Sequence, residues 1–186
     1  MFDLAPLTDD QSDALITALH AGLRADERAV VAARCDGVPF YIEQVVNGIS
    51  QTGVPEALYE PLFARLRASP KAVPVVEAAA VIGRQIDRRL LCSVVDLSDD
   101  EVDDVIDELE DALVLERWGS DLWRFRHELL REVAAELAPP TVRRGLHAKV
   151  ADVLIGAGEP DWQLIAPHYE RGAIRRRGVV LRAGVE

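Results

Sequence analysis

The chain has 186 residues, of which 49% are hydrophobic and 28% are charged, and its formal net charge is −11. This length allows one large domain or two small ones, and the composition is that of an ordinary globular protein with a buried core. The negative charge disfavours binding to nucleic-acid phosphates and to anionic membranes, unless a local basic patch overrides it.

The sequence carries no membrane or export signal. No apolar run approaches the roughly 20 residues that a membrane-spanning helix needs. The N-terminal stretch MFDLAPLTDD lacks the basic and apolar regions of a signal peptide. Cys35 and Cys92 lie in apolar helical sequence, which is typical of buried free thiols in a reducing compartment. We therefore expect a cytoplasmic protein that makes no membrane contact.

The first third of the chain is predicted to form four short helices. Thr8 and Gln11 have the spacing of a capping box, which predicts a first helix that runs to about His20. Asp26 is expected to cap a second helix over residues 27–34.

The turn Gly37-Val38-Pro39 then interrupts sequence that otherwise favours a helix. Pro39 suits the first position of a third helix, because the N–H that proline lacks has no helical partner there. Apolar residues follow at helical spacing and predict one buried face: Ile42, Val45, Val46 and Ile49. The stretch SQTGVP is predicted to be a linker, and a fourth helix is expected over residues 56–67.

The middle of the chain predicts three more helices. A mostly apolar helix is expected over residues 71–82, followed by a turn, GRQID, and by a helix that Asp87 caps and that runs to Val95. Ser98 and Glu101 form a second capping box. The helix that it opens has one apolar face: Val102, Val105, Ile106, Leu109 and Leu113.

The hydrophobic period changes in the stretch LVLERWGSDLWRFR. This stretch predicts two short strands around Gly119-Ser120-Asp121, and three helices followed by a β-hairpin is the element order of a winged helix. Further helices are expected over residues 128–138, 142–155 (with Thr141 as the N-cap), 161–171 and 174–183. The last two have the length of the paired helices in helical repeat arrays.

No complete catalytic or metal-binding motif is present in this sequence. A phosphate-binding P-loop ends in Gly-Lys-Ser/Thr, and neither lysine of the chain, Lys71 or Lys149, follows a glycine. The four histidines show no metal-ligand spacing with each other or with cysteine, and no nucleophile motif is found. We therefore expect that this chain alone is not an enzyme.

The predicted helix from Ser98 to Asp111 carries nine acidic residues and no Lys or Arg. In a winged helix the third helix normally enters the DNA major groove, but a face this acidic would be repelled by the phosphate backbone. DNA binding through this helix is therefore not expected. Two interpretations stay open: a solvated helix face, and a docking surface for a basic protein partner.

Five segments, in this order, resemble one known family: RCDGVPFYIEQVV, VPEALYEPLFARLRASP, EAAAVIGRQIDRRLL, RFRHELLREVAAEL and RRGLHAKVADVL. The chain is similar to the C-terminal part of the AAA-like ATPase module of STAND-type signalling NTPases. The branch it resembles is the bacterial one attached to class III adenylate cyclases and to LuxR- or MalT-type transcription regulators. The resemblance covers nearly the whole chain. It does not include the nucleotide-binding α/β domain that comes first in that family.

The resemblance implies a mainly α fold with three parts. It predicts a small helical lid domain over residues 1–68, a winged-helix domain with a short β-hairpin over 69–138, and helical hairpins over 139–186 that start a TPR-like array. It also implies a partner, which is an upstream nucleotide-binding domain that holds ATP or ADP. The isolated chain is expected to need no cofactor, since that domain is missing from it.

The Gly-x-Pro turn has a family role in this resemblance. In the family, the turn belongs to the lid and its proline packs against the adenine ring. The residues suit this role, since Gly37 permits a close backbone approach and Pro39 offers a rigid apolar face without a competing donor. The alternative is that Gly37 and Pro39 only end one helix and start the next.

His127 lies where the hairpin is predicted to end and a helix to begin. In related ATPases, including apoptosome and plant resistance proteins, a winged-helix histidine in this context reaches the β-phosphate of ADP and holds the protein closed. A helix start adds N–H groups for an anion. The alternative is a histidine that caps the helix or packs beneath the hairpin, and His147 is expected to pack or to lie on a helix surface.

The resemblance therefore predicts a regulatory fragment of a nucleotide-switched signalling ATPase, which closes over ADP and opens with ATP. It would belong to a cyclase- or transcription-regulator-type protein. Gly37, Pro39 and His127 are the predicted nucleotide-facing residues. Two other function classes remain: a DNA-binding winged-helix transcription regulator and a helical protein-interaction adaptor.

Overall fold

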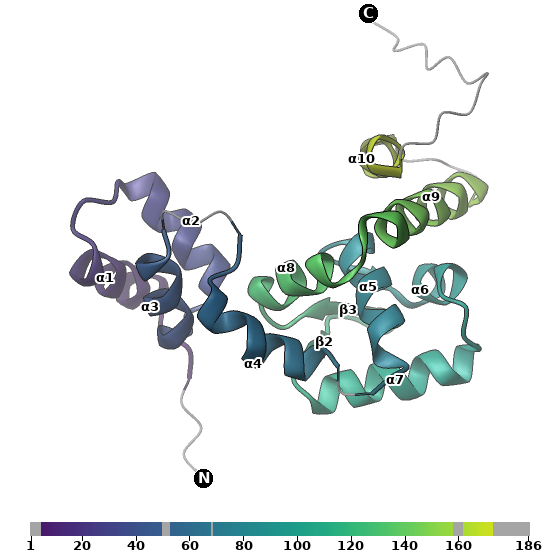
Figure 1. Ribbon diagram of the computed structural model, residues 1–186, viewed down its shortest axis with the longest axis horizontal. Helices are drawn as coiled ribbons and strands as arrows, with labels where there is room; N and C mark the ends of the chain where they lie inside the picture. Colours follow the sequence, from purple (N-terminus) through teal and green to yellow (C-terminus); the bar gives the residue numbers. More distant parts are fainter. Residues whose placement is uncertain (1–4, 50–52, 68, 158–161, 173–186) are drawn as a thin grey trace, which may run out of the picture.

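The computed structural model describes residues 5–49, 53–67, 69–157 and 162–172. Over these residues the chain is mainly α-helical, with ten helices and a small three-stranded antiparallel sheet (Figure 1). The helices are α1 (Asp9–Leu19), α2 (Ala25–Cys35), α3 (Pro39–Asn47), α4 (Glu56–Leu66), α5 (Ala72–Ile82), α6 (Arg88–Val94), α7 (Asp99–Asp111), α8 (Glu128–Leu137), α9 (Pro140–Gly156) and α10 (Trp162–Gly172). The strands are β1 (Ile86–Asp87), β2 (Leu115–Arg117) and β3 (Leu122–Phe125).

The elements form an elongated arrangement in which α8 is central (Figure 1). Helices α1, α2 and α3 pack on one another at one end, and α4 leads from them to the second group. This second group places α5, α6, α7 and α8 around the sheet, and α9 and α10 follow at the other end. Helix α8 contacts α2, α4, α5 and β3.

The predicted capping boxes are confirmed. The Thr8 hydroxyl accepts a hydrogen bond from the Gln11 N–H and the Gln11 side chain accepts one from the Thr8 N–H, so α1 starts where predicted. Ser98 and Glu101 make the same reciprocal pair at α7. Asp87 also caps α6, because its carboxylate accepts from the Leu90 N–H at 3.0 Å.

Two predicted caps are wrong. Helix α2 begins at Ala25 with Arg24 as its N-cap residue, and the Glu27 carboxylate accepts from the Arg24 N–H at 2.8 Å. Asp26 lies inside the first turn and pairs with Arg24 instead. Helix α9 begins at Pro140, which lacks an N–H and fits the first turn, so Thr141 lies within the helix.

The predicted hairpin is confirmed, and a third strand joins it. Strands β2 and β3 pair antiparallel, and Leu115 lies opposite Phe125. The GRQID segment, expected to be only a turn, supplies the two-residue strand β1, which pairs with β3 through Ile86 and Trp123. The sheet order is β1-β3-β2. Two residues are too few to show an alternating pattern, so no sequence pattern indicates β1.

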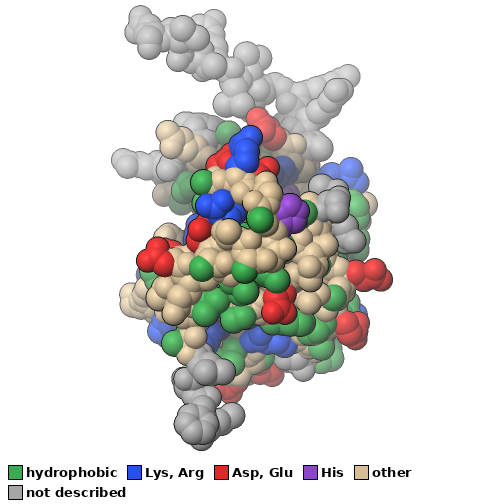
Figure 2. Space-filling model, turned by 90° about the vertical axis from the view of Figure 1, so that its left-hand side faces the viewer, with side chains coloured by type: hydrophobic (Ala, Val, Ile, Leu, Met, Phe, Trp, Pro, Cys, Tyr) green, Lys and Arg blue, Asp and Glu red, His purple; other side chains and the backbone are tan. Residues whose placement is uncertain are grey.

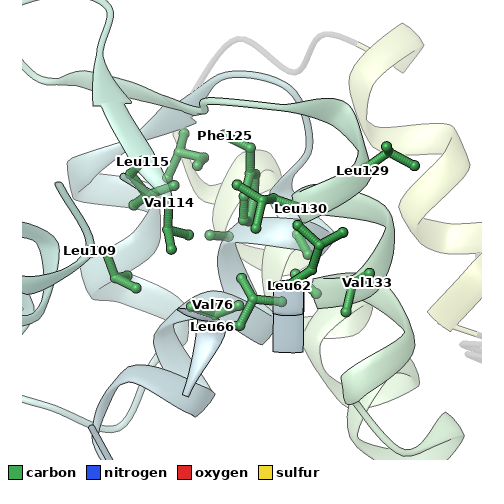
Figure 3. Close-up of a cluster of buried hydrophobic side chains, with 14 of the residues drawn as sticks. Leu62, Leu66, Val76, Leu109, Val114, Leu115, Phe125, Leu129, Leu130 and Val133 are labelled. Atoms are coloured by element: carbon green, nitrogen blue, oxygen red, sulfur yellow. The ribbon is translucent and has the colours of Figure 1, made fainter. Parts of the chain in front are cut away.

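The apolar core lies between α4, α5, α7, α8 and the sheet. Leucines of α4 and α8 point toward one another there, with Val76 of α5 and Phe125 of β3 beside them (Figure 3). Two members of the predicted faces are exposed instead: Leu113 at 48% and Ile49 at 40%. Both lie beyond the last residue of their helix, and Leu113 has a positive φ of 55°, so helical spacing does not apply to them.

Helix α4 contacts both the α1–α3 group and the core. Its Leu62 and Leu66 are buried in the cluster with Leu130 (Figure 3), and its Arg65 guanidinium donates to the carbonyl oxygens of Ala112 and Leu113 at the end of α7. The predicted domain boundaries at 68 and 138 remain predictions. Within the described ranges, no helix is both long and apolar enough to cross a bilayer.

Helices α9 and α10 pack against each other at the C-terminal end. His147 of α9 is 5% exposed, and its Nδ1 lies 2.8 Å from Nδ1 of His168 on α10. The predicted packing role of His147 is therefore confirmed. The last predicted helix, over residues 174–183, falls outside the described residues.

Candidate functional site

The predicted Gly-x-Pro turn joins α2 to α3 and is tightly constrained. Asp36 and Gly37 both have positive φ, of 48° and 70°. The Gly37 carbonyl accepts from the Leu7 N–H at 2.8 Å, and a Cβ on Gly37 would lie only 2.4 Å from the Leu7 carbonyl oxygen. Gly37 thus permits the predicted close backbone approach, and the segment that approaches it is the one preceding α1.

Pro39 occupies the first position of α3 and is exposed, as is Phe40 beside it at 48%. The next two residues point the other way, since Tyr41 and Ile42 are buried in the core of the α1–α3 group. The start of α3 therefore presents an apolar surface to solvent. Pro39 is available for an outside contact, which burial in its own core would have prevented.

His127 lies against this same turn. It is the N-cap residue of α8, and its ring meets the Tyr41 ring edge-on at a centroid distance of 5.5 Å. Its Nδ1 is 3.7 Å from Oδ2 of Asp36, which is too long for a hydrogen bond, so this buried nitrogen has no partner among the described residues. The His127 side chain is 15% exposed.

Asp36 connects the turn to α8. Its Oδ2 accepts from the Glu128 backbone N–H at 3.0 Å and so satisfies one of the free N–H groups at the start of α8. A cap usually comes from the residue just before the helix, but here it comes from a residue 92 positions earlier. Asp36 was not among the predicted site residues, and no local sequence signal identifies such a distant cap.

The structure therefore places His127 and the start of α8 against the turn that contains Gly37 and Pro39. The contacts to this region are made by their sequence neighbours: Asp36 caps α8 and approaches His127, and Tyr41 packs on the His127 ring. We call this contact between the α2–α3 turn and the start of α8 the turn–α8 junction. A role for it in binding nucleotide stays a prediction.

A small cavity of about 70 Å³ opens beside the junction. Four arginines and two acids line it together with Phe125: Arg84, Arg124, Arg126, Arg131, Asp36 and Glu128. Arg124 pairs with Glu116, and Arg131 pairs with Glu128. The side chains of Arg84 and Arg126 have no hydrogen-bond or ion-pair partner in the described part of the chain. Neither arginine was among the predicted site residues. The stretch RFRH, which contains Arg126, is a local basic signal, but no such signal surrounds Arg84.

Two further ion-pair and hydrogen-bond contacts hold the first helices to α8. Arg34 of α2 pairs with Glu132, and its Nε donates at 2.7 Å. The Tyr59 hydroxyl of α4 donates to Glu136 at 2.6 Å, and this carboxylate raises the pKa of Tyr59 to about 12. Burial raises the pKa of the Cys35 thiol to about 12 as well, so Cys35 is an inert core residue.

Part of the negative charge of helix α7 is neutralised by ion pairs with basic side chains of the same chain. Arg88 pairs with Asp103 at 2.7 Å and lies 3.8 Å from Asp99. Lys71 pairs with Glu101 at 2.9 Å and, together with the Ser98 hydrogen bonds, lowers the pKa of that carboxyl to about 2. Among the described residues no group of three or more His, Cys, Asp and Glu side chains could hold a metal ion.

No family model, curated protein or solved structure matches this chain.

Proposed function

We propose that this chain is the lid, winged helix and first repeat helices of a nucleotide-switched signalling ATPase. The observation that carries the proposal is that His127, at the start of α8, lies against the turn that contains Gly37 and Pro39. A histidine with an unpartnered Nδ1 and an exposed proline at one junction are the two groups that such a switch uses for phosphate and adenine.

The arrangement of α5 to β3 supports the winged-helix assignment. Three helices precede the β2–β3 hairpin, and the short strand β1 between the first two helices completes a three-stranded sheet. In this proposal the lid consists of α1 to α4, although the apolar side chains of α4 pack into the core beside α8. The α9–α10 pair would be the first unit of the helical array.

Apolar side chains exposed on the α1–α3 group support a missing neighbour domain. Those of Leu19, Val30, Phe40 and Ile49 are each at least 40% exposed. Figure 2, which views the molecule from this end, shows apolar side chains at the surface between charged ones. A nucleotide-binding domain that comes before this chain in the full protein would cover part of this surface, since large apolar patches on a protein usually mark contact sites.

The charges at the junction suit a phosphate group. Arg84 and Arg126 line the cavity beside Asp36, and their side chains have no partner among the described residues. A phosphate there would accept hydrogen bonds from these guanidinium groups and from a His127 nitrogen that carries a proton. These contacts would exist only while the α2–α3 turn stays on α8. A nucleotide that makes them would therefore favour the closed arrangement.

The test is nucleotide affinity in the full-length protein that contains this chain. Replacing His127 with Ala should weaken ADP binding by about ten- to a hundredfold, since a hydrogen bond to a charged group contributes about 1.5–3 kcal/mol. ATP binding should change less, because the open form makes no contact through His127. His20, an exposed histidine outside the junction, is the matched control as His20→Ala.

Two results would contradict the proposal. Equal losses for ADP and ATP would mean that His127 does not distinguish the two states. Unchanged affinity for both would leave His127 as a packing residue beneath Tyr41, and the helical adaptor would then be the better function. The gene sequence before Met1 gives an independent check, because the proposal requires a Gly-Lys-Ser/Thr loop there.

A further inference from the structure

A second basic cavity lies on the far side of Arg131 from the junction. Its volume is about 400 Å³, and it lies between α5, α8, α9 and α10. Its polar lining residues are four arginines and one histidine: Arg131, Arg143, Arg144, Arg171 and His147. We call it the α9 arginine cleft. Among the described residues no Asp or Glu lines it, although the chain as a whole has a net charge of −11.

Two of the four arginines of the cleft have hydrogen-bond or ion-pair partners among the described residues, and two have none. Arg131 pairs with Glu128, and Arg143 donates to the Ala135 carbonyl at 3.1 Å. Arg144 and Arg171 are exposed, and their side chains have no hydrogen-bond or ion-pair partner among the described residues. Two guanidinium groups on different helices thus line one cavity without a counter-charge, and each offers a planar set of donors that fits phosphate oxygens.

The pKa values of His147, which lines the cleft, and of its neighbour His168 are both lowered. Burial is the main cause that lowers the pKa of His147 to about 4, and the nearby His168, Arg171 and Arg143 lower it further. The pKa of His168 is also lowered, by burial and then by Arg171. Both rings are therefore neutral at pH 7, and the charge of the cleft comes from its arginines.

We propose that the α9 arginine cleft is a binding site for a small, multiply charged phosphate anion. A concave site with one sign of charge concentrates ions of the opposite sign more strongly than a flat surface does. The two unpaired guanidinium groups of Arg144 and Arg171 supply the specific hydrogen bonds. Arg131 and Arg143 add charge from the wall of the cleft. The site does not depend on Gly37, Pro39 or His127, so it stands or falls separately from the function proposed above.

Occupancy of this site would connect three helices. Arg131 belongs to α8, Arg143 and Arg144 to α9, and Arg171 to α10. An anion that bridges them would stabilise the packing of α9 and α10 on α8, because it binds only when the three helices are together.

The test is a calorimetric titration of the chain with inorganic pyrophosphate, in a phosphate-free buffer at low salt. We expect one binding site in the unchanged chain. The double variant Arg144→Gln/Arg171→Gln should lose at least about tenfold in affinity, as expected for two charge-assisted hydrogen bonds. The matched control is Arg67→Gln/Arg89→Gln, which removes the same charge from two exposed arginines that do not line the cleft, and it should lose less than about twofold.

Amide NMR shifts locate the site during the same titration. Pyrophosphate should move the signals of α9 and of the end of α10, and circular dichroism should show that every variant keeps its helices.

N-acetyl-phosphoserine amide tests whether the cleft also binds a phosphate carried on a protein. If this compound binds as tightly as pyrophosphate, the cleft recognises the phosphate group itself. If it binds at least tenfold more weakly, the ligand is the free anion. No binding of pyrophosphate at millimolar concentration, shifts confined to other helices, or an equal loss in the control variant would overturn the proposal.

Discussion

The two sides of α8 hold their neighbours by different means. One side buries Leu129, Leu130, Val133 and Ala134 against α4, α5 and the sheet (Figure 3). The other side carries Glu128, Glu132 and Glu136, four residues apart, and meets the first helices through hydrogen bonds and ion pairs. Water competes well for half-exposed polar contacts and poorly for buried apolar ones. The α1–α3 group is therefore easier to separate from α8 than α4 and the core are.

This difference fits a switch in which the core stays intact while the turn–α8 junction opens. The apolar side fixes the position of α8 in both states. The polar side offers contacts that a nucleotide or water can replace at a modest cost in free energy.

The largest effect is expected on the apolar side. Replacing the fully buried Leu130 with Ala should lower the free energy of unfolding by about 2–5 kcal/mol, because the variant loses burial and leaves a cavity. Urea denaturation followed by circular dichroism measures this change. A loss below 1 kcal/mol would mean that this side of α8 is not part of the cooperative core.

Low pH should destabilise the folded chain at the contact between α9 and α10, where His147 and His168 lie. The folded chain lowers the pKa of His147 to about 4 and also lowers that of His168, so it favours their neutral forms. Stability from this pair is complete above pH 6.5 and falls as the pH drops from 6.5 toward 4. For His147 the loss reaches about 3 kcal/mol at most.

Thermal unfolding of His147→Leu and of the unchanged chain, measured across this pH range, checks the effect. The melting temperature of the unchanged chain should fall relative to that of the variant as the pH drops, because the variant lacks the buried histidine that acid must protonate. The exposed His20, replaced with Gln, should leave the pH profile unchanged. A constant difference across the range would contradict the role of the buried pair.

A smaller effect is expected at the turn. In Gly37→Ala the new Cβ would meet the Leu7 carbonyl oxygen, and the residue would keep a positive φ, so we expect a loss of about 1–3 kcal/mol. Gly145 in α9 is the control, since a Cβ there meets nothing within 4 Å and a helical alanine should stabilise by about 1 kcal/mol. Urea midpoints of the two variants should therefore move in opposite directions.

The smallest effect is expected from an ion pair on the polar side. Glu132→Gln removes the charge that Arg34 faces, while Arg34 keeps its hydrogen bond to the Gly53 carbonyl at 2.8 Å. The loss should be about 1 kcal/mol or less. Hydrogen exchange should quicken in α2 and stay unchanged in α5. Equal acceleration in both helices would show that the polar side does not open separately.

The sequence predicted local features better than contacts between distant segments. Thr8, Asp87 and Ser98 act within three residues of themselves, so their caps could be read from spacing. The cap on α8 comes from Asp36 in the distant α2–α3 turn, and strand β1 forms only because β3 lies beside it. The prediction that Leu113 and Ile49 are buried was wrong for a related reason. Helical spacing does not predict which way a side chain points beyond the residue at which the helix ends.

The candidate site was partly predictable for the same reason. Gly37, Pro39 and His127 stand at element boundaries that the sequence marks by turn residues and a change of period. Their meeting at one junction, and the unpaired Arg84 and Arg126 beside it, depend on how α2 and α8 pack. Only the structure shows that packing.

The most direct test of the switch is the distance between α1 and α7 in the full-length protein. Spin labels at Thr17→Cys and Asp107→Cys, both exposed positions, report it once Cys92 is replaced with Ser and Cys35 is left buried. With ADP we predict one short distance, and with ATP a second, longer one. His127→Ala should bring the longer distance into the ADP sample. The same single distance with ADP, with ATP and in the variant would contradict a nucleotide-controlled junction.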